Sequence, residues 1–241
     1  MLDHVTIRVS DRNASEAFYD TVLATIGLAK TASGEQYTEW QAFSLAAATA
    51  EKPVTRRLHV AFSAPSRALV DRFWHVGRES GFRDDGAPGP RLEYGDDYYG
   101  GFLLDPDGNS VEAVHHGRVR TQGGIDHLWV RVRDLESSRE FYELIAPHSG
   151  FELRDTRRDR VHFAGDDASF ALVRGEPTEN LHLAFSAEAN ETVDAFHRAA
   201  MDAGYRDEGP PGERIVYHAG YYGAFVLDPD GNNVEVVNHN R

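Results

Sequence analysis

Hydrophobic and polar residues alternate along four stretches of the chain, which predicts strands that bury one face. In residues 2–9 the apolar positions begin at Val5 and recur at every second residue, while His4 and Arg8 lie on the opposite, polar face. The apolar face is expected to pack under a helix, which leaves the polar face for a functional site. The four stretches are residues 2–9, 58–63, 125–132 and 181–186.

After each of these strands, the spacing of apolar residues changes to that of an amphipathic helix. Phe18 and Val22 belong to the first helix, and Gly27 follows it as a terminating residue. The corresponding helix of the second half begins near residue 135 and is expected to stop at Pro147, because proline cannot continue the backbone hydrogen bonding.

The remaining segments predict short strands and turns. Residues 36–50 indicate two or three short strands, and residues 84–90 and 207–213 are so rich in Gly and Pro that loops are expected there. Residues 102–116 read as strand, D-P-D-G-N turn and strand, and this hairpin returns at residues 225–239.

The two hairpins show that the chain is a tandem repeat. Shifting the sequence by 123 residues (225 − 102 = 123) aligns the halves without a gap. Each half predicts two βαβββ units, so the expected fold is α+β, with four units in two domains. We place the domains at residues 1–120 and 124–241, with the boundary near residue 121 in a short polar joint.

Composition narrows the possible functions. The chain has 241 residues, with 25 Lys and Arg against 39 Asp and Glu, and the net charge of −14 argues against nucleic acid or an anionic membrane as a partner. There is no cysteine and no apolar stretch long enough to span a membrane, so thiolate metal sites are excluded and a cytoplasmic protein is expected. Histidine is abundant, with 12 residues; we interpret His115, His116 and His239 as solvated residues at strand ends.

The candidate chemistry lies on the polar faces of the strands. Each half carries two histidines at strand openings and one glutamate within the hairpin strand, where an unpartnered carboxylate would be costly. Two imidazoles and one carboxylate on a rigid sheet form the facial triad that binds iron, manganese, zinc or nickel and leaves coordination positions open. The candidate metal ligands are His4, His59 and Glu112 in the first half and His127, His182 and Glu235 in the second.

Four further residues are candidates for substrate binding. Arg8 and Arg131 share the polar strand face with the first histidines and could anchor a carboxylate or phosphate, or else pair with a ligand glutamate. Tyr98 and Tyr221 could line the same face, or else pack within the hairpin.

These motifs resemble those of the vicinal oxygen chelate superfamily, which includes glyoxalase I, extradiol ring-cleaving dioxygenases and the fosfomycin and bleomycin resistance proteins. The resemblance implies two tandem glyoxalase-like domains, each with a curved sheet that forms a cup, a divalent metal ion and the six ligands named above. Because paired units exchange partners in this superfamily, a site could form within one half or between halves. The motifs are L-D-H-V at 2–5, I-D-H-L at 125–128, L-H-V-A-F at 58–62, L-H-L-A-F at 181–185 and D-P-D-G-N-x-V-E in both hairpins.

The chain departs from the better known members in two respects. Glyoxalase I members use a fourth Glu or Gln ligand, yet residues 42–48 and 168–173 hold no carboxylate or amide. Extradiol dioxygenases usually carry a tyrosine where this chain has Phe102 and Phe225.

Three functions follow as alternatives. The first is a metal-dependent lyase, isomerase or ring-cleaving dioxygenase that acts on a small oxygenated substrate, as a monomer or homodimer. The second is a resistance-type protein that binds or sequesters a small molecule with Trp40 and Trp129, without catalysis. The third is a structural or regulatory tandem domain.

Overall fold

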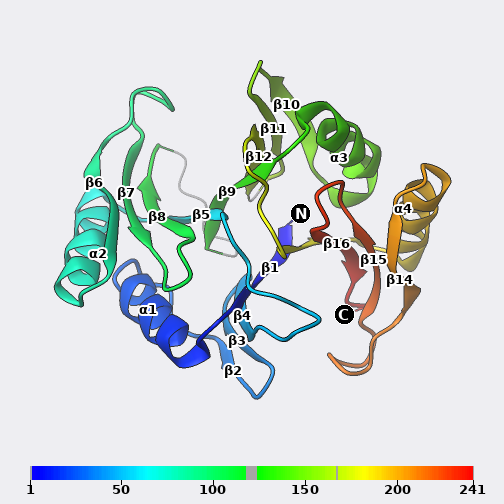
Figure 1. Cartoon of the computed structure of the whole chain (residues 1–241), viewed down its shortest axis with the longest axis horizontal. Coiled ribbons are helices and arrows are strands. Elements are labelled where there is room, and N and C mark those ends of the chain that lie inside the picture. Colours follow the sequence, from blue (N-terminus) through cyan, green and yellow to red (C-terminus); the bar gives the residue numbers. More distant parts are fainter. Residues whose placement is uncertain (1, 118–123, 167, 241) are drawn as a thin grey trace.

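The computed structural model describes residues 2–117, 124–166 and 168–240, which form four βαβββ units, two in each half of the chain (Figure 1). The boundary expected near residue 121 lies outside the described residues. The units of the first half are β1 (Leu2–Val9), α1 (Arg12–Ala24), β2 (Ala32–Ser33), β3 (Tyr37–Trp40) and β4 (Phe43–Ala47), then β5 (His59–Ser63), α2 (Arg67–Glu79), β6 (Arg83–Pro90), β7 (Tyr99–Leu104) and β8 (Ser110–His115).

The second half repeats this order of elements. Its units are β9 (Ile125–Val132), α3 (Leu135–Ser149), β10 (Glu152–Thr156), β11 (Arg160–Ala164) and β12 (Ser169–Arg174), then β13 (His182–Ser186), α4 (Asn190–Asp202), β14 (Arg206–Glu213), β15 (Tyr222–Leu227) and β16 (Asn233–Asn238).

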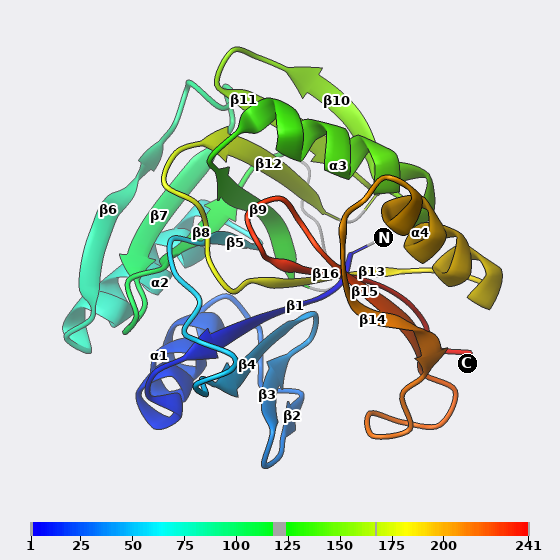
Figure 2. The same cartoon turned by 45° about the vertical axis from the view of Figure 1, so that its right-hand side comes forward.

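The units pair between the halves rather than within them. One eight-stranded sheet has the order β14-β15-β16-β13-β1-β4-β3-β2, and the other has the order β10-β11-β12-β9-β5-β8-β7-β6. The first unit therefore shares a sheet with the fourth, through antiparallel pairing of β1 with β13, and the second shares a sheet with the third, through β5 and β9. Each sheet curls into a U, and the two sheets lie back to back (Figures 1 and 2).

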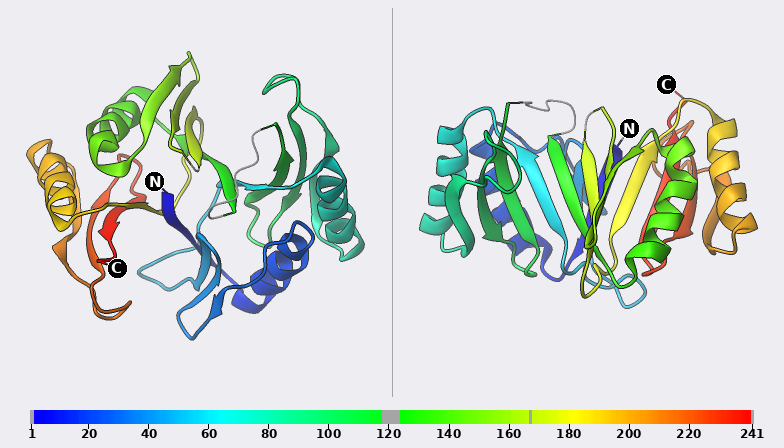
Figure 3. Two further views of the ribbon diagram at one scale, coloured as in Figure 1. Left: turned by 180° about the vertical axis from the view of Figure 1, so that it is seen from behind. Right: turned by 90° about the horizontal axis from the view of Figure 1, so that it is seen from above.

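The helices cover the outer, convex sides of the curled sheets. Helices α1 and α2 lie together at one end of the molecule, and α3 and α4 lie together at the other (Figure 3). Helix α1 begins after Asp11, whose carboxylate caps the helix by accepting a hydrogen bond from the Ala14 amide. Within the described parts of the chain, no helix is long and apolar enough to cross a membrane.

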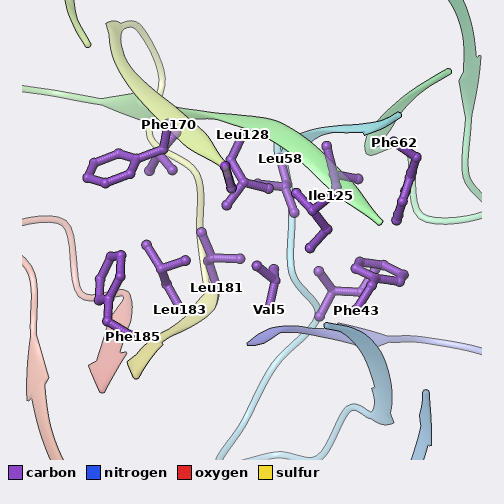
Figure 4. Close-up of a cluster of buried hydrophobic side chains, with 14 of the residues drawn as sticks. Val5, Phe43, Leu58, Phe62, Ile125, Leu128, Phe170, Leu181, Leu183 and Phe185 are labelled. Carbon is purple, nitrogen blue, oxygen red and sulfur yellow. The ribbon is translucent and has the colours of Figure 1, made fainter. Parts of the chain in front are cut away.

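A shared hydrophobic core joins the two sheets at their backs. Val5, Leu58, Leu128 and Leu181 come from four different units and point toward one another in the middle of the molecule (Figure 4). All four side chains are buried. The apolar faces of the central strands are buried in this shared core and under the helices. The polar faces predicted from the alternation therefore lie on the concave side of each sheet.

Three local predictions were wrong. Helix α3 continues through Pro147 to Ser149 and ends at Gly150, whose φ of 70° suits a left-handed cap, because a proline in the last turn removes only one backbone donor. The segments predicted as loops at 84–90 and 207–213 are the strands β6 and β14. Both lie at the edge of a sheet, where a proline need not donate a hydrogen bond, and both contain bulges.

The repeat is also not gapless in space. Phe43 pairs with Val5 in the first unit and Phe170 pairs with Leu128 in the third, so β12 is displaced by 127 residues from β4 (170 − 43 = 127), against 123 for Val5 and Leu128. Two residues lie between the paired Trp40 and Phe43, whereas six lie between the paired Phe163 and Phe170, so this turn is longer by four residues. The connection from β12 to β13 is four residues shorter than that from β4 to β5.

Candidate metal centres

The six predicted ligands form two clusters, and each cluster takes residues from both halves. Site A consists of His4, His182 and Glu235, and site B consists of His59, Glu112 and His127. Of the two arrangements left open by the sequence, the structure brings together residues of different halves and not a set from one half, such as His4 with His59 and Glu112. The reason is the exchange of units between the sheets, since each site lies across one antiparallel pair.

Strand register explains how each cluster forms. In site A, His4 on β1 lies opposite Ala184 on β13, and Ala184 lies beside Glu235 on β16. His182 is two residues before Ala184, so its side chain points to the same face of the sheet. In site B, Ala61 on β5 takes the place of Ala184, between His127 and Glu112.

The distances in site A are short. Nε2 of His4 lies 3.0 Å from Nε2 of His182 and 3.7 Å from Oε2 of Glu235. Nε2 of His182 lies 3.1 Å from the same carboxylate oxygen. Three ligand atoms therefore converge on one point above Ala184.

Site B is similar but more deeply buried. Oε2 of Glu112 lies 3.1 Å from Nε2 of His59 and 3.5 Å from Nε2 of His127. Both histidine side chains of site B are 10% exposed, whereas those of His4 and His182 are 25% and 21% exposed.

Two glycines make room for the glutamates. A Cβ atom on Gly100 or Gly223 would overlap Oε1 of Glu112 or Glu235, respectively, well inside van der Waals contact. The carboxylates therefore occupy space that the side chain of any larger residue at position 100 or 223 would fill.

The candidate residues Tyr98 and Tyr221 contact the ligand glutamates directly. The Tyr98 hydroxyl donates a hydrogen bond of 2.8 Å to Oε1 of Glu112, and the Tyr221 hydroxyl donates one of 2.7 Å to Oε1 of Glu235. Burial and the neighbouring carboxylate raise the pKa of both phenols far above its usual value, so both remain protonated donors. Each glutamate is thus held with Oε2 toward the histidines.

Two aspartates that we did not single out from the sequence hold the first histidine of each site. Asp3 accepts a hydrogen bond from Nδ1 of His4 at 2.7 Å and another from His239 at 2.8 Å. Asp126 is equivalent, at 2.9 Å from Nδ1 of His127. The signal was present in the repeated L-D-H and I-D-H motifs, where an acidic residue precedes the ligand in both halves.

The interpretation of His116 and His239 as solvated strand ends was wrong. Nε2 of His116 lies 2.8 Å from Asp126, and His239 bonds Asp3 and also lies 2.9 Å from His218. Although burial would raise the pKa of Asp126, its hydrogen bonds with His116 and His127 hold it well below the usual range. The carboxylate is therefore charged while it orients the ligand.

The ligand histidines differ in basicity. Burial lowers the pKa of His59 and His182, despite the adjacent Glu112 and Glu235. For His4, burial acts in the same direction, but the hydrogen bond with Asp3 and the charge of Glu235 outweigh it and raise the pKa.

The remaining candidates lie further from the ligands. Arg8 and Arg131 are four residues along the strand from His4 and His127, on the same face, as the alternation indicated. The Arg8 guanidinium bonds the Ala47 carbonyl at 3.1 Å.

The two tryptophans named from the sequence have different surroundings. Trp129 packs against His59, with ring centroids 5.3 Å apart, and thus lies in site B. Trp40 is fully buried in the core and bonds Asp20, so it does not line either site.

Both clusters suit a divalent ion. With Nδ1 of His4 and His127 donating to aspartates, each Nε2 presents a lone pair, and these lone pairs meet a carboxylate oxygen at short range. Acceptors crowded in this way repel one another unless a cation or proton lies between them. Two ligand atoms in neighbouring positions, each about 2.1 Å from one ion, lie about 3 Å apart, close to the shorter distances found here.

Solved structures of other proteins share this fold. The chain resembles glyoxalase I from Zea mays, with a TM-score of 0.70 and 20% identity over 99% of this chain and 92% of that one. It also resembles a putative dioxygenase from Bacillus subtilis, with a TM-score of 0.67 and 14% identity over 100% of this chain and 85% of that one. At these identities the likeness concerns the fold. No curated protein sequence matches the chain significantly.

A family model matches the sequence twice, once in each half. The matched residues are 1–113 and 124–236, which include all six residues of the two sites. The chain belongs to the Glyoxalase/Bleomycin resistance protein/Dioxygenase superfamily.

Proposed function

We propose that the protein is a divalent-metal-dependent enzyme whose substrate is a small molecule that chelates the ion through two neighbouring oxygen atoms. The observation that carries this proposal is the convergence of two imidazole nitrogens and one carboxylate oxygen at each of two places. Iron, manganese, zinc or nickel suits such ligands. The reaction would be that of a lyase, an isomerase or a ring-cleaving dioxygenase.

The absence of a fourth ligand in the described residues favours a three-ligand reaction over that of glyoxalase I. The positions on β4 and β12 that lie beside the site-bearing strands are Ser44 beside Thr6, Ser169 beside His127 and Ala171 beside Trp129. None of these offers a carboxylate or an amide. A six-coordinate ion held by three protein atoms keeps adjacent positions for the two oxygens of a substrate.

When bound, the ion would supply Lewis acidity and fix the orientation of the chelating oxygens. The chain's own residues would do the rest. Tyr98 and Tyr221 hold the glutamates through their hydroxyls, so these oxygen atoms are already engaged and would not bind a substrate. Arg8 and Arg131 would bind an anionic group of the substrate further along the concave face.

Site B also offers an aromatic wall. Tyr94 contacts Trp129 edge to face, with centroids 5.4 Å apart, and Trp129 contacts His59. The Tyr94 side chain is 42% exposed, so its ring is accessible to a ligand. This wall would bind the planar or apolar part of a substrate next to the ion.

The same wall supports a second candidate function, that of a binding protein without catalysis. In that case an aromatic ligand would pack against the wall formed by Tyr94 and Trp129, with no role for the ion. Tight binding that is unaffected by His59→Ala and His182→Ala would favour this second function.

Metal content tests the proposal. Protein purified without a histidine tag or chelator, and analysed by mass spectrometry for metals, is expected to hold up to two ions per chain. The substitutions His59→Ala and His182→Ala should each remove one ion. Protein that binds no divalent metal after reconstitution would refute the proposal.

A further inference from the structure

The side chains that bond directly to the candidate ligands differ between the two sites for one histidine. His4 and His127 are each held by an aspartate, and each glutamate is held by a tyrosine. The remaining pair of equivalent ligands is His59 and His182, which are 123 residues apart (182 − 59 = 123). Only the first of these two has a partner for Nδ1 among the described residues.

In site B, a chain of hydrogen bonds leads from His59 to the surface. Nδ1 of His59 lies 3.0 Å from the hydroxyl of Ser110, and this hydroxyl lies 2.6 Å from Oδ2 of Asp85. The Asp85 carboxylate can only accept, so Ser110 donates its single proton to it. Ser110 must then accept from His59, which fixes the proton on Nδ1 and leaves the Nε2 lone pair facing Glu112.

In site A, the equivalent positions do not form this chain. Asn233 takes the place of Ser110 beside the histidine, since His182 pairs with Asn233 as His59 pairs with Ser110. Glu208 takes the place of Asp85 within the same bulge of the edge strand. Nδ1 of His182 and Oδ1 of Asn233 are both buried, and neither has a hydrogen-bond partner within residues 2–117, 124–166 and 168–240.

We propose that site B is the tighter of the two metal sites, and that Ser110 and Asp85 are positioning residues that set the tautomer and ring orientation of His59. This inference rests on the metal dependence proposed above. An unpartnered histidine can rotate or carry its proton on Nε2, and either change must be reversed before the nitrogen binds an ion. Partners of this kind are worth about 10–100-fold in metal affinity.

Single-site variants of the full chain provide the test. His182→Ala leaves site B and His59→Ala leaves site A, and the zinc dissociation constant of each metal-free variant is measured by calorimetry. We expect site B to bind zinc about 10–100-fold more tightly than site A. In the His182→Ala background, Ser110→Ala should remove most of that advantage and Ser110→Thr, which keeps a hydroxyl, should restore it.

Matched changes in site A separate positioning from general damage. In the His59→Ala background, Asn233→Ala should leave zinc affinity within about twofold, because Oδ1 of Asn233 has no hydrogen-bond partner to lose among the described residues. Asn233→Ser with Glu208→Asp should instead tighten binding. The tautomer of His59 is read from its nitrogen-15 chemical shifts. These should report a proton on Nδ1 in the protein with Ser110 and in Ser110→Thr, but not in Ser110→Ala. Thermal unfolding confirms that each variant is folded.

The outcomes are distinguishable. Equal zinc affinities of the two sites, or an unchanged affinity and tautomer after Ser110→Ala, would overturn this inference while leaving the proposed metal dependence intact. Failure of both folded single-site variants to bind zinc, iron, manganese or nickel would reject the proposed function and the inference together.

Discussion

Sites A and B have the same candidate ligands on the same pattern of strands, yet their surroundings differ. Trp129 of site B corresponds to Thr6 of site A, and Thr6 bonds Ser44 instead of covering a histidine. The site B histidines are less than half as exposed as those of site A. Two sites with the same candidate ligands are therefore not equivalent. The residues that surround the ligands determine how exposed the ligands are and how their side chains are oriented.

The charge of the two concave faces differs as well. In the sheet of site B, Arg160 and His162 on β11 lie in register with Arg131 and Trp129 on β9, across β12. In the sheet of site A, the corresponding positions on β3 are Tyr37 and Glu39. The Glu39 charge acts on His4. Site B therefore combines two arginines with an aromatic wall, which favours an anionic aromatic ligand there over site A.

The largest expected effect comes from filling the space beside the glutamates. Gly100→Ala should displace the Glu112 carboxylate and weaken zinc binding at site B by at least about 100-fold, the upper end of the range for residues that only support a ligand. Gly223→Ala should do the same at site A. Zinc titration of each variant measures the loss. Gly34→Ala is the control for glycine replacement, because this glycine is exposed and an added Cβ would meet only a backbone oxygen, at 3.9 Å. Unchanged zinc affinity would mean that the carboxylate is not a ligand.

Each half also has a buried aspartate in the turn before its glutamate strand, Asp105 in the first half and Asp228 in the second. Burial raises the pKa of both, and that of Asp228 to about 6, although hydrogen bonds from Asn232 and Tyr142 act in the opposite direction. The unfolded value is about 3.9, so the folded protein holds this proton more tightly.

The stability that Asp228 contributes is thus fully present below about pH 4 and is lost as the pH rises through 6. The shift corresponds to about 3 kcal/mol at most in the free energy of unfolding. Urea unfolding from about pH 4 to 7 should show this decline in the wild type and a smaller one in Asp228→Asn. An equal decline in both would assign it to other groups.

The tyrosines should have a smaller effect. Tyr98→Phe and Tyr221→Phe each remove one hydrogen bond to a ligand glutamate and should weaken zinc binding at their own site by about 10-fold. Tyr99→Phe is the matched control, because its hydroxyl bonds Asp71 on α2, away from both sites. A loss of zinc affinity in the control equal to that in Tyr98→Phe would argue against a specific role.

The smallest expected effect is on the binding of an anionic ligand, and it should differ between the Arg131 and Arg8 variants. Arg131→Gln should raise the dissociation constant of a carboxylate-bearing catechol several-fold while leaving that of plain catechol unchanged, because only the former needs a cation. Arg8→Gln should have less effect, since the Arg8 guanidinium is already bonded to Ala47. Calorimetry with both ligands measures the difference, and equal losses for the two ligands would remove Arg131 from the binding of the anionic group.

The sequence alone predicted the strands that bear the candidate ligands, the four units and the six residues that form the two clusters, because alternation and the repeat are local properties of the chain. The pairing of His4 with His182 was left open, since alternation shows which face a residue occupies but not which strand lies beside it. The chain from His59 through Ser110 to Asp85 was missed for the same reason: it joins three strands. Segments 84–90 and 207–213 were mistaken because the sequence does not identify an edge strand.

The exchange of units has a further consequence for the unfolded chain. An ion in site A would join residue 4 to residue 235 and close a loop of 231 residues (235 − 4 = 231), whereas an ion in site B closes 68 residues between positions 59 and 127 (127 − 59 = 68). Closing the longer loop removes about 1 kcal/mol more conformational entropy from the unfolded state. The site with the poorer support for its ligands is therefore the one whose ion would fasten the first strand of the protein to its last.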